Sequence, residues 1–202
     1  RLADLCMLGA TALLWMTYGT PHIHAMLAQA AGGPLPGTAQ LAVVLLACTA
    51  VLKCAQLPFH GWLIQVMEAP TPVSALLHAG IVNLGGFVLL RFAPLVSEVP
   101  AAQTLLVVAG AATAVLAALV MTTRISIKVM LAWSTCAQMG FMLMQCGLGA
   151  WEMAWLHLLA HSLYKAHAFL AAGGVVRRSQ VHQLAPAAAV PTGAGVAVGL
   201  LL

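Results

Sequence analysis

Residues 155–170 read Trp-Leu-His-Leu-Leu-Ala-His-Ser-Leu-Tyr-Lys-Ala-His-Ala-Phe-Leu, which places ionisable side chains inside an apolar run. His157, His161 and Lys165 follow one another at intervals of four residues, so on an α-helix they form a nearly straight column. The column extends over about 12 Å, at about 1.5 Å of rise per residue. A charged side chain at the centre of a bilayer costs about 2.5–3.5 kcal/mol on insertion scales, so such groups usually serve a function. The column therefore predicts a proton path within a membrane helix.

The composition places the whole chain in a lipid bilayer. The 202 residues are 62% hydrophobic and only 6% charged, whereas soluble domains carry about 25% charged residues. The formal net charge of +4 is too small and too scattered to indicate nucleic-acid binding, so no nucleic acid is expected as a partner. The five cysteines form no Cys-x-x-Cys pair and have no zinc or iron–sulfur spacing. We interpret them as small apolar side chains.

Apolar runs of about 20 residues, the length that crosses a bilayer, follow one another along the chain. They lie at about 2–19, 39–57, 72–95, 101–121, 126–147 and 151–173, and another begins near 190. We therefore predict an all-α polytopic membrane protein in which residues 1–202 form a single transmembrane domain. Because the chain starts at Arg1 without Met and stops inside an apolar run, we interpret it as an internal fragment of a longer protein.

Residues 57–72 do not fit a continuous span. They read Leu-Pro-Phe-His-Gly-Trp-Leu-Ile-Gln-Val-Met-Glu-Ala-Pro-Thr-Pro, so Pro58 and Pro70 enclose a short helix. With Lys53 just before it, this pattern predicts a broken membrane helix near 53–70. Interrupted helices are tolerated at membrane depth where they are buried in protein or line a water-filled cavity, and transporters use them for sites. Lys53 could instead be a lysine that reaches for the interface from the cytoplasmic end of its span.

The basic residues predict a topology. Arg124 lies at one connection, and Arg177 and Arg178 lie at another, two crossings later, so they share one side of the membrane. Counting back, residues 57–72 and Arg1 fall on the same side. The positive-inside rule places this side in the cytoplasm.

The column in residues 155–170 has alternative interpretations. His157 and His161 could bind haem or a metal ion, but no Glu follows the first histidine as in His-Glu-x-x-His, and Lys165 would oppose a metal. The three residues could also be unrelated buried polar groups in a purely structural subunit. A proton wire fits better, because imidazole titrates near neutrality and can pass a proton between its two nitrogens.

Other polar residues extend this prediction. His78 lies in the apolar run 72–95, where it is either a hydrogen-bonded core residue or a further member of the relay. We expect no catalytic site, no metal site and no cofactor on this chain. The predicted proton-transfer residues are Lys53, His78, His157, His161 and Lys165, with Asp4, His60, Glu68, Lys128 and His167 as possible accessory residues.

Two stretches carry a family resemblance. Residues 53–63 (Lys-Cys-Ala-Gln-Leu-Pro-Phe-His-Gly-Trp-Leu) lead to 70–79 (Pro-Thr-Pro-Val-Ser-Ala-Leu-Leu-His-Ala), and residues 128–142 lead to 157–166 (His-Leu-Leu-Ala-His-Ser-Leu-Tyr-Lys-Ala). They resemble the antiporter-like membrane subunits shared by respiratory complex I and the multisubunit cation/proton antiporters. The resemblance implies a fourteen-helix fold with two inverted halves, each with a broken helix. This chain would hold the end of the first half and much of the second.

The resemblance also implies roles for single residues. Lys53 matches the lysine of the family's broken helix, and Lys165 matches the central lysine of the second half. His78 matches the histidine of the helix after the break, His157 and His161 match the two histidines before the central lysine, and Asp4 matches an acidic position before the broken helix. The glutamate that pairs with the first lysine would lie upstream of Arg1, and the final broken helix would lie beyond Leu202.

The run Ala-Gly-Ile-Val-Asn-Leu-Gly-Gly-Phe after His78 is most similar to the membrane subunit of DAB-type inorganic carbon transporters. That resemblance implies a proton or sodium gradient coupled to bicarbonate or CO2 uptake in the bacterial inner (plasma) membrane. It also implies a large soluble, zinc-containing, carbonic-anhydrase-like subunit as partner. The nearest alternative is a proton-pumping subunit of NADH:quinone oxidoreductase, with other complex I membrane subunits as partners.

Overall fold

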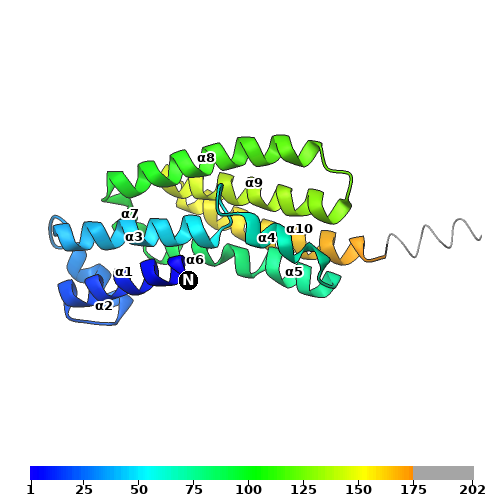
Figure 1. Ribbon diagram of the computed structural model, residues 1–202. Coiled ribbons are helices and arrows are strands. Elements are labelled where there is room, and N and C mark those ends of the chain that lie inside the picture. Colours follow the sequence, from blue (N-terminus) through cyan, green and yellow to red (C-terminus); the bar gives the residue numbers. More distant parts are fainter. Residues whose placement is uncertain (175–202) are drawn as a thin grey trace, which may run out of the picture.

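Helices make up all the regular structure in residues 1–174, the part of the chain that the computed structural model describes (Figure 1). This confirms the predicted all-α fold; the span predicted near 190 lies outside the described residues. The elements are α1 (Leu2–Tyr18), α2 (Ile23–Ala30), α3 (Gly37–Lys53), α4 (Gly61–Gln65), the 3-10 turn η1 (Val66–Glu68), α5 (Thr71–Ala79), the 3-10 turn η2 (Ile81–Asn83), α6 (Leu84–Arg91), α7 (Ala93–Ser97), α8 (Pro100–Thr122), α9 (Ile127–Gly147) and α10 (Trp151–Ala172).

The described helices suit a membrane. Thr71–Arg91, Pro100–Thr122 and Ile127–Gly147 are each long and apolar enough to cross a bilayer. The pair α1 and α2, bent by 61° at the break between them, would make a fourth span if counted as one. The α10 helix has 22 residues and carries the ionisable column of the sequence analysis.

The helices α8 and α9 pack with their backbones in close contact. A Cβ atom on Gly110 would lie 2.5 Å from the carbonyl oxygen of Gly140, and a Cβ on Gly140 would lie 2.6 Å from that of Gly110. Small residues permit this approach between membrane helices, where burial of apolar surface supplies little driving force. Glycine is therefore required at both positions, and α9 is held firmly beside α8.

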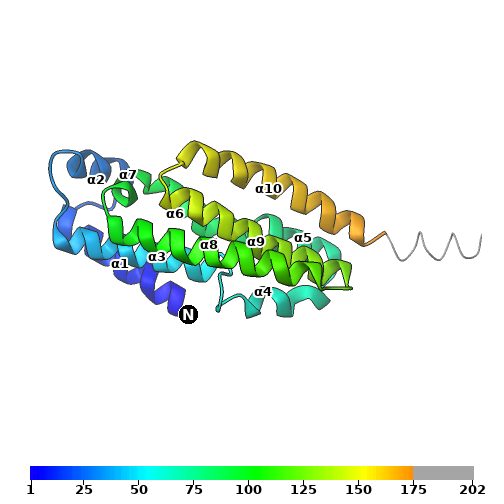
Figure 2. The ribbon, with the colours of Figure 1, turned by 90° about the horizontal axis from the view of Figure 1, so that it is seen from above.

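The broken helix predicted near 53–70 is present. The α3 helix ends at Lys53, and α4 and η1 follow before Pro70. Ala55, with φ of 51°, has the left-handed backbone that ends the α-helix. Figures 1 and 2 show that α3 ends about midway along the bundle, with α4 in the other half. Lys53 is the last residue of α3, so the helix stops before the apolar run 39–57 does.

The structure contains one helix that the sequence analysis left as a connection. The α2 helix forms between α1 and α3 because Ile23, Met26, Leu27 and Ala30 recur at helical spacing. Met26 is buried in the core, and the other three pack against it. These four residues form an apolar stripe along one face of the helix.

The predicted span 72–95 is interrupted as well. The α5 helix ends at Ala79, and η2 separates it from α6. The side chain of Asn83 donates hydrogen bonds of 2.8 Å to the carbonyl of Ala79 and of 2.8 Å to the hydroxyl of Ser162 on α10. An amide side chain that bonds the local backbone in this way competes with the regular helical pattern. The break thereby ties this span to α10.

Candidate proton-transfer site

The side chain of Lys165, on α10, is fully buried and contacts α9. Its Nζ donates a hydrogen bond of 3.2 Å to the backbone carbonyl of Leu131 and contacts the hydroxyl of Ser134. Both partners are neutral oxygens of α9. Within residues 1–174 no carboxylate pairs with this ammonium group, so its charge has no balancing partner in that part of the chain. Such a lysine suits the loading and release of a proton.

His78 on α5 faces the same part of α9. The side chain is fully buried, and Nδ1 lies 3.2 Å from the hydroxyl oxygen of Thr135. The Thr135 hydroxyl donates in turn, over 2.9 Å, to the carbonyl of Leu131. On its other side the imidazole stacks on Phe169 of α10, with ring centroids 4.4 Å apart. His78 is thus linked to Lys165 through Thr135 and a shared carbonyl.

The two histidines that precede Lys165 on α10 differ in their surroundings. His161 is 2% exposed, and within the described residues neither of its ring nitrogens has a hydrogen-bond partner. His157 is half-buried, and its Nδ1 lies 3.0 Å from Oε1 of Gln145 on α9. The two ring centroids are 6.2 Å apart. The column predicted from the sequence therefore lies along the face of α10 that contacts α9.

Lys53 stands apart from these residues. Its Nζ lies 2.6 Å from a carboxylate oxygen of Asp4 on α1, and the two side chains are 37% and 58% exposed. The structure thus pairs Asp4 with Lys53. A cavity of about 360 Å³ adjoins Lys53 and reaches Ile81, three residues after His78. Within the described residues, no hydrogen bond joins Lys53 to His78.

The accessory candidates divide into two groups. Lys128 lies three residues before Leu131 on α9 and donates a 2.9 Å hydrogen bond to the carbonyl of Ala69, in the segment between η1 and α5. The ring of His60 packs against Trp133 of α9, with centroids 4.8 Å apart. These two side chains therefore join the broken segment to α9. Glu68 and His167 are exposed.

Sequence reasoning missed two residues of the site. Gln145 holds His157, and Ser162 binds Asn83. Gln145 is 8% exposed, and it lies in the otherwise apolar run Phe-Met-Leu-Met-Gln-Cys. A lone amide inside such a run is a usable signal, because buried polar groups need hydrogen-bond partners. Ser162 lies beside His161 and carried no comparable signal.

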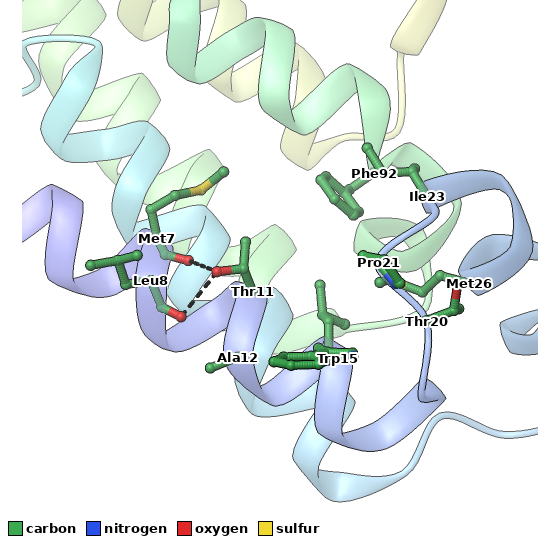
Figure 3. A pocket seen from close by; sticks show the side chains of 11 residues that line it. Met7, Leu8, Thr11, Ala12, Trp15, Thr20, Pro21, Ile23, Met26 and Phe92 are labelled. Atoms are coloured by element: carbon green, nitrogen blue, oxygen red, sulfur yellow. Dashed lines mark hydrogen bonds between the residues drawn. The ribbon is translucent and has the colours of Figure 1, made fainter.

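A larger cavity, of about 510 Å³, lies between α1, α2 and the end of α6 (Figure 3). Its wall is mainly apolar, and the hydroxyl of Thr11 donates to the carbonyls of Met7 and Leu8 in its own helix. The cavity contains none of the buried ionisable groups. Among residues 1–174, no three His, Cys, Asp or Glu side chains are grouped so that they could hold a metal ion.

The buried ionisable groups and the helical fold define an antiporter-like integral membrane subunit. Residues 1–188 match the family described as "NADH:quinone oxidoreductase/Mrp antiporter, TM", and the chain belongs to this family.

Its relatives include transporter and respiratory subunits. The chain is 55% identical, over 94% of its length, to the "Probable inorganic carbon transporter subunit DabB" of Hydrogenovibrio crunogenus, of which it covers 37%. It is 45% identical, over 68% of its length, to "NADH-quinone oxidoreductase subunit L" of Rhodobacter capsulatus, of which it covers 20%. The chain thus spans between a fifth and two fifths of these relatives.

A solved structure shares the fold. The "Structure of Mrp complex from Dietzia sp. DQ12-45-1b" matches 91% of this chain and 20% of the other, with a TM-score of 0.81 and 38% identity.

Proposed function

We propose that this chain carries protons through the membrane along a relay of buried lysine and histidine side chains. The observation that supports it is that His78, His161 and Lys165 are all 2% exposed or less, and that His78 and Lys165 both contact α9. Burying an ionisable side chain costs free energy when it is charged. Several such side chains close together in a membrane protein therefore usually serve a function that depends on their protonation. Lys53, paired with Asp4, would form a separate proton-binding site, and His157 would extend the relay on α10.

We further propose that the relay couples an ion gradient to inorganic carbon uptake in the inner membrane of a bacterium. The identity to DabB supports this assignment. A soluble zinc-containing, carbonic-anhydrase-like subunit would be the partner, and bicarbonate or CO2 the cargo. The likeness to subunit L favours the second candidate, a proton-pumping subunit of NADH:quinone oxidoreductase.

Proton movement is tested with the full-length protein and its partner in vesicles that contain a pH-sensitive dye. Replacing Lys165 by Met is expected to slow proton flux by about 100-fold, the lower range for loss of an acid–base group. His24→Ala, which changes an exposed histidine on α2, is the control. Unchanged flux in the Lys165 variant would refute the relay.

The partner is tested by purifying the native full-length protein and identifying bound proteins by mass spectrometry. A zinc-containing soluble subunit would support inorganic carbon uptake. Flavin and iron–sulfur subunits would support the respiratory alternative instead, and leave the relay in place.

A further inference from the structure

The carbonyl oxygen of Leu131 has more hydrogen-bond donors around it than it can accept from at once. The hydroxyl of Ser134 donates to it over 3.0 Å, that of Thr135 over 2.9 Å and Nζ of Lys165 over 3.2 Å. The backbone N–H of Thr135 points to the same oxygen in a regular α-helix. A carbonyl oxygen has two lone pairs, so these donors compete.

The competition depends on the charge of Lys165. A charged ammonium has three donors and no acceptor, so Ser134 must accept from it and can turn its own proton only toward Leu131. The two lone pairs of the carbonyl are then taken by the backbone N–H of Thr135 and by Lys165 or Ser134. A neutral amine has two N–H donors and one lone pair. The lone pair accepts the Ser134 proton, so Ser134 no longer donates to the carbonyl, and Thr135 can take its place there.

The direction of the Thr135 hydroxyl determines which nitrogen of His78 carries the proton. When Thr135 donates to Leu131, its oxygen can only accept from His78, which requires a proton on Nδ1. When the carbonyl is taken, Thr135 donates to Nδ1, and the proton of the neutral ring resides on Nε2. That nitrogen is buried and, within the described residues, has no other partner.

We propose that the charge of Lys165 selects the tautomer of His78 through the hydroxyl groups of Ser134 and Thr135 on α9. Each hydroxyl changes the partner to which it donates its proton when the charge of Lys165 changes. A charged Lys165 selects the Nε2–H form, and a neutral Lys165 selects the Nδ1–H form. Both forms hold one proton, so the net charge of His78 stays the same. The inference rests on the proposed function in one respect, namely that Lys165 changes charge during transport.

The test is nitrogen-15 NMR of the full-length protein with labelled histidine, with His78 assigned by its loss in His78→Asn. Lys165→Arg keeps a permanent cation, and Lys165→Met removes it. We expect the protonated ring nitrogen of His78 to be Nε2 in the first variant and Nδ1 in the second. The same tautomer in both would overturn the inference.

Thr135 supplies a second test that leaves Lys165 intact. Thr135→Ser keeps the hydroxyl, and Thr135→Val replaces it by a methyl group of the same shape. The serine variant is expected to keep the wild-type ring signals of His78. The valine variant is expected to shift the Nδ1 signal and to slow proton flux by about 10-fold or more. Unchanged signals in the valine variant would contradict the inference.

The proton relay and the tautomer inference can be refuted independently of each other. A tautomer of His78 that follows Lys165, in a protein whose flux ignores Lys165, would support the inference and refute the relay. Flux that needs Lys165, with a tautomer that does not respond, would refute the inference alone.

Discussion

Gln145, like Thr135, is a residue whose replacement should affect the relay without removing an ionisable group. Its amide oxygen lies 3.0 Å from Nδ1 of His157 and so favours a proton on that nitrogen. Replacing it by Leu leaves His157 without this partner, which costs about 1–3 kcal/mol for a buried group. We expect slower proton flux with the protein still assembled, measured in vesicles after a thermal-stability check.

Gln65→Leu, at an exposed position of α4, serves as the control. Equal flux in both variants would show that the contact with His157 only fills space.

The pair of Lys53 and Asp4 predicts a non-additive double-mutant cycle. Lys53→Met leaves the Asp4 carboxylate without its 2.6 Å partner, and Asp4→Asn leaves the ammonium. Because both side chains are partly exposed, each single change should lower the midpoint of thermal unfolding only slightly, and the double variant should lose less than the sum of the two, with only a weak coupling between them. Thermal unfolding of the full-length protein in detergent measures this, and additive losses would argue that the pair is not coupled.

At the scale of elements, the close backbone contact between α8 and α9 at Gly110 and Gly140, here called the seam, limits the size of the side chain that either position can carry. A side chain at Gly140 would meet the backbone of Gly110, which cannot move aside, so Gly140→Val should cost more than the usual 1–3 kcal/mol of overpacking. The expected result is loss of folded protein in the membrane, measured by size-exclusion chromatography. Ala112→Val, on an exposed position of α8, should leave the yield unchanged. Equal yields for both would mean that the helices can separate at this seam.

The limits of sequence reasoning are clearest among the elements. The long spans followed from apolar runs, and the break after Lys53 followed from the prolines. The α2 helix was missed because its stripe of Ile23, Met26, Leu27 and Ala30 is short and lies between stretches rich in Gly and Pro. The contact of His78 with Thr135 joins residues 57 positions apart, and no local pattern reports such a pairing. The column on α10 needed only helical periodicity, so the sequence predicted it.

At the scale of the whole molecule, we expect cysteines introduced at the two ends of the helix bundle to be labelled from opposite sides of the membrane. Figure 1 places the α8–α9 connection at one end and the α7–α8 and α9–α10 connections at the other. In a full-length protein freed of its reactive native cysteines, Arg124→Cys should react with a membrane-impermeant maleimide only in inverted vesicles, as the positive-inside rule requires. Glu98→Cys should react only in intact cells. The reverse pattern would invert the topology.

The glycine seam has a mechanical consequence. The backbones of α8 and α9 are in contact at Gly110 and Gly140, so we expect the two helices to move together as one rigid unit. The α5 and α10 helices meet α9 at the relay through a hydroxyl, a carbonyl and a lysine tip, contacts that tolerate small rotations. We therefore expect any motion that accompanies a change of charge at Lys165 to occur in α5 and α10 rather than in α9.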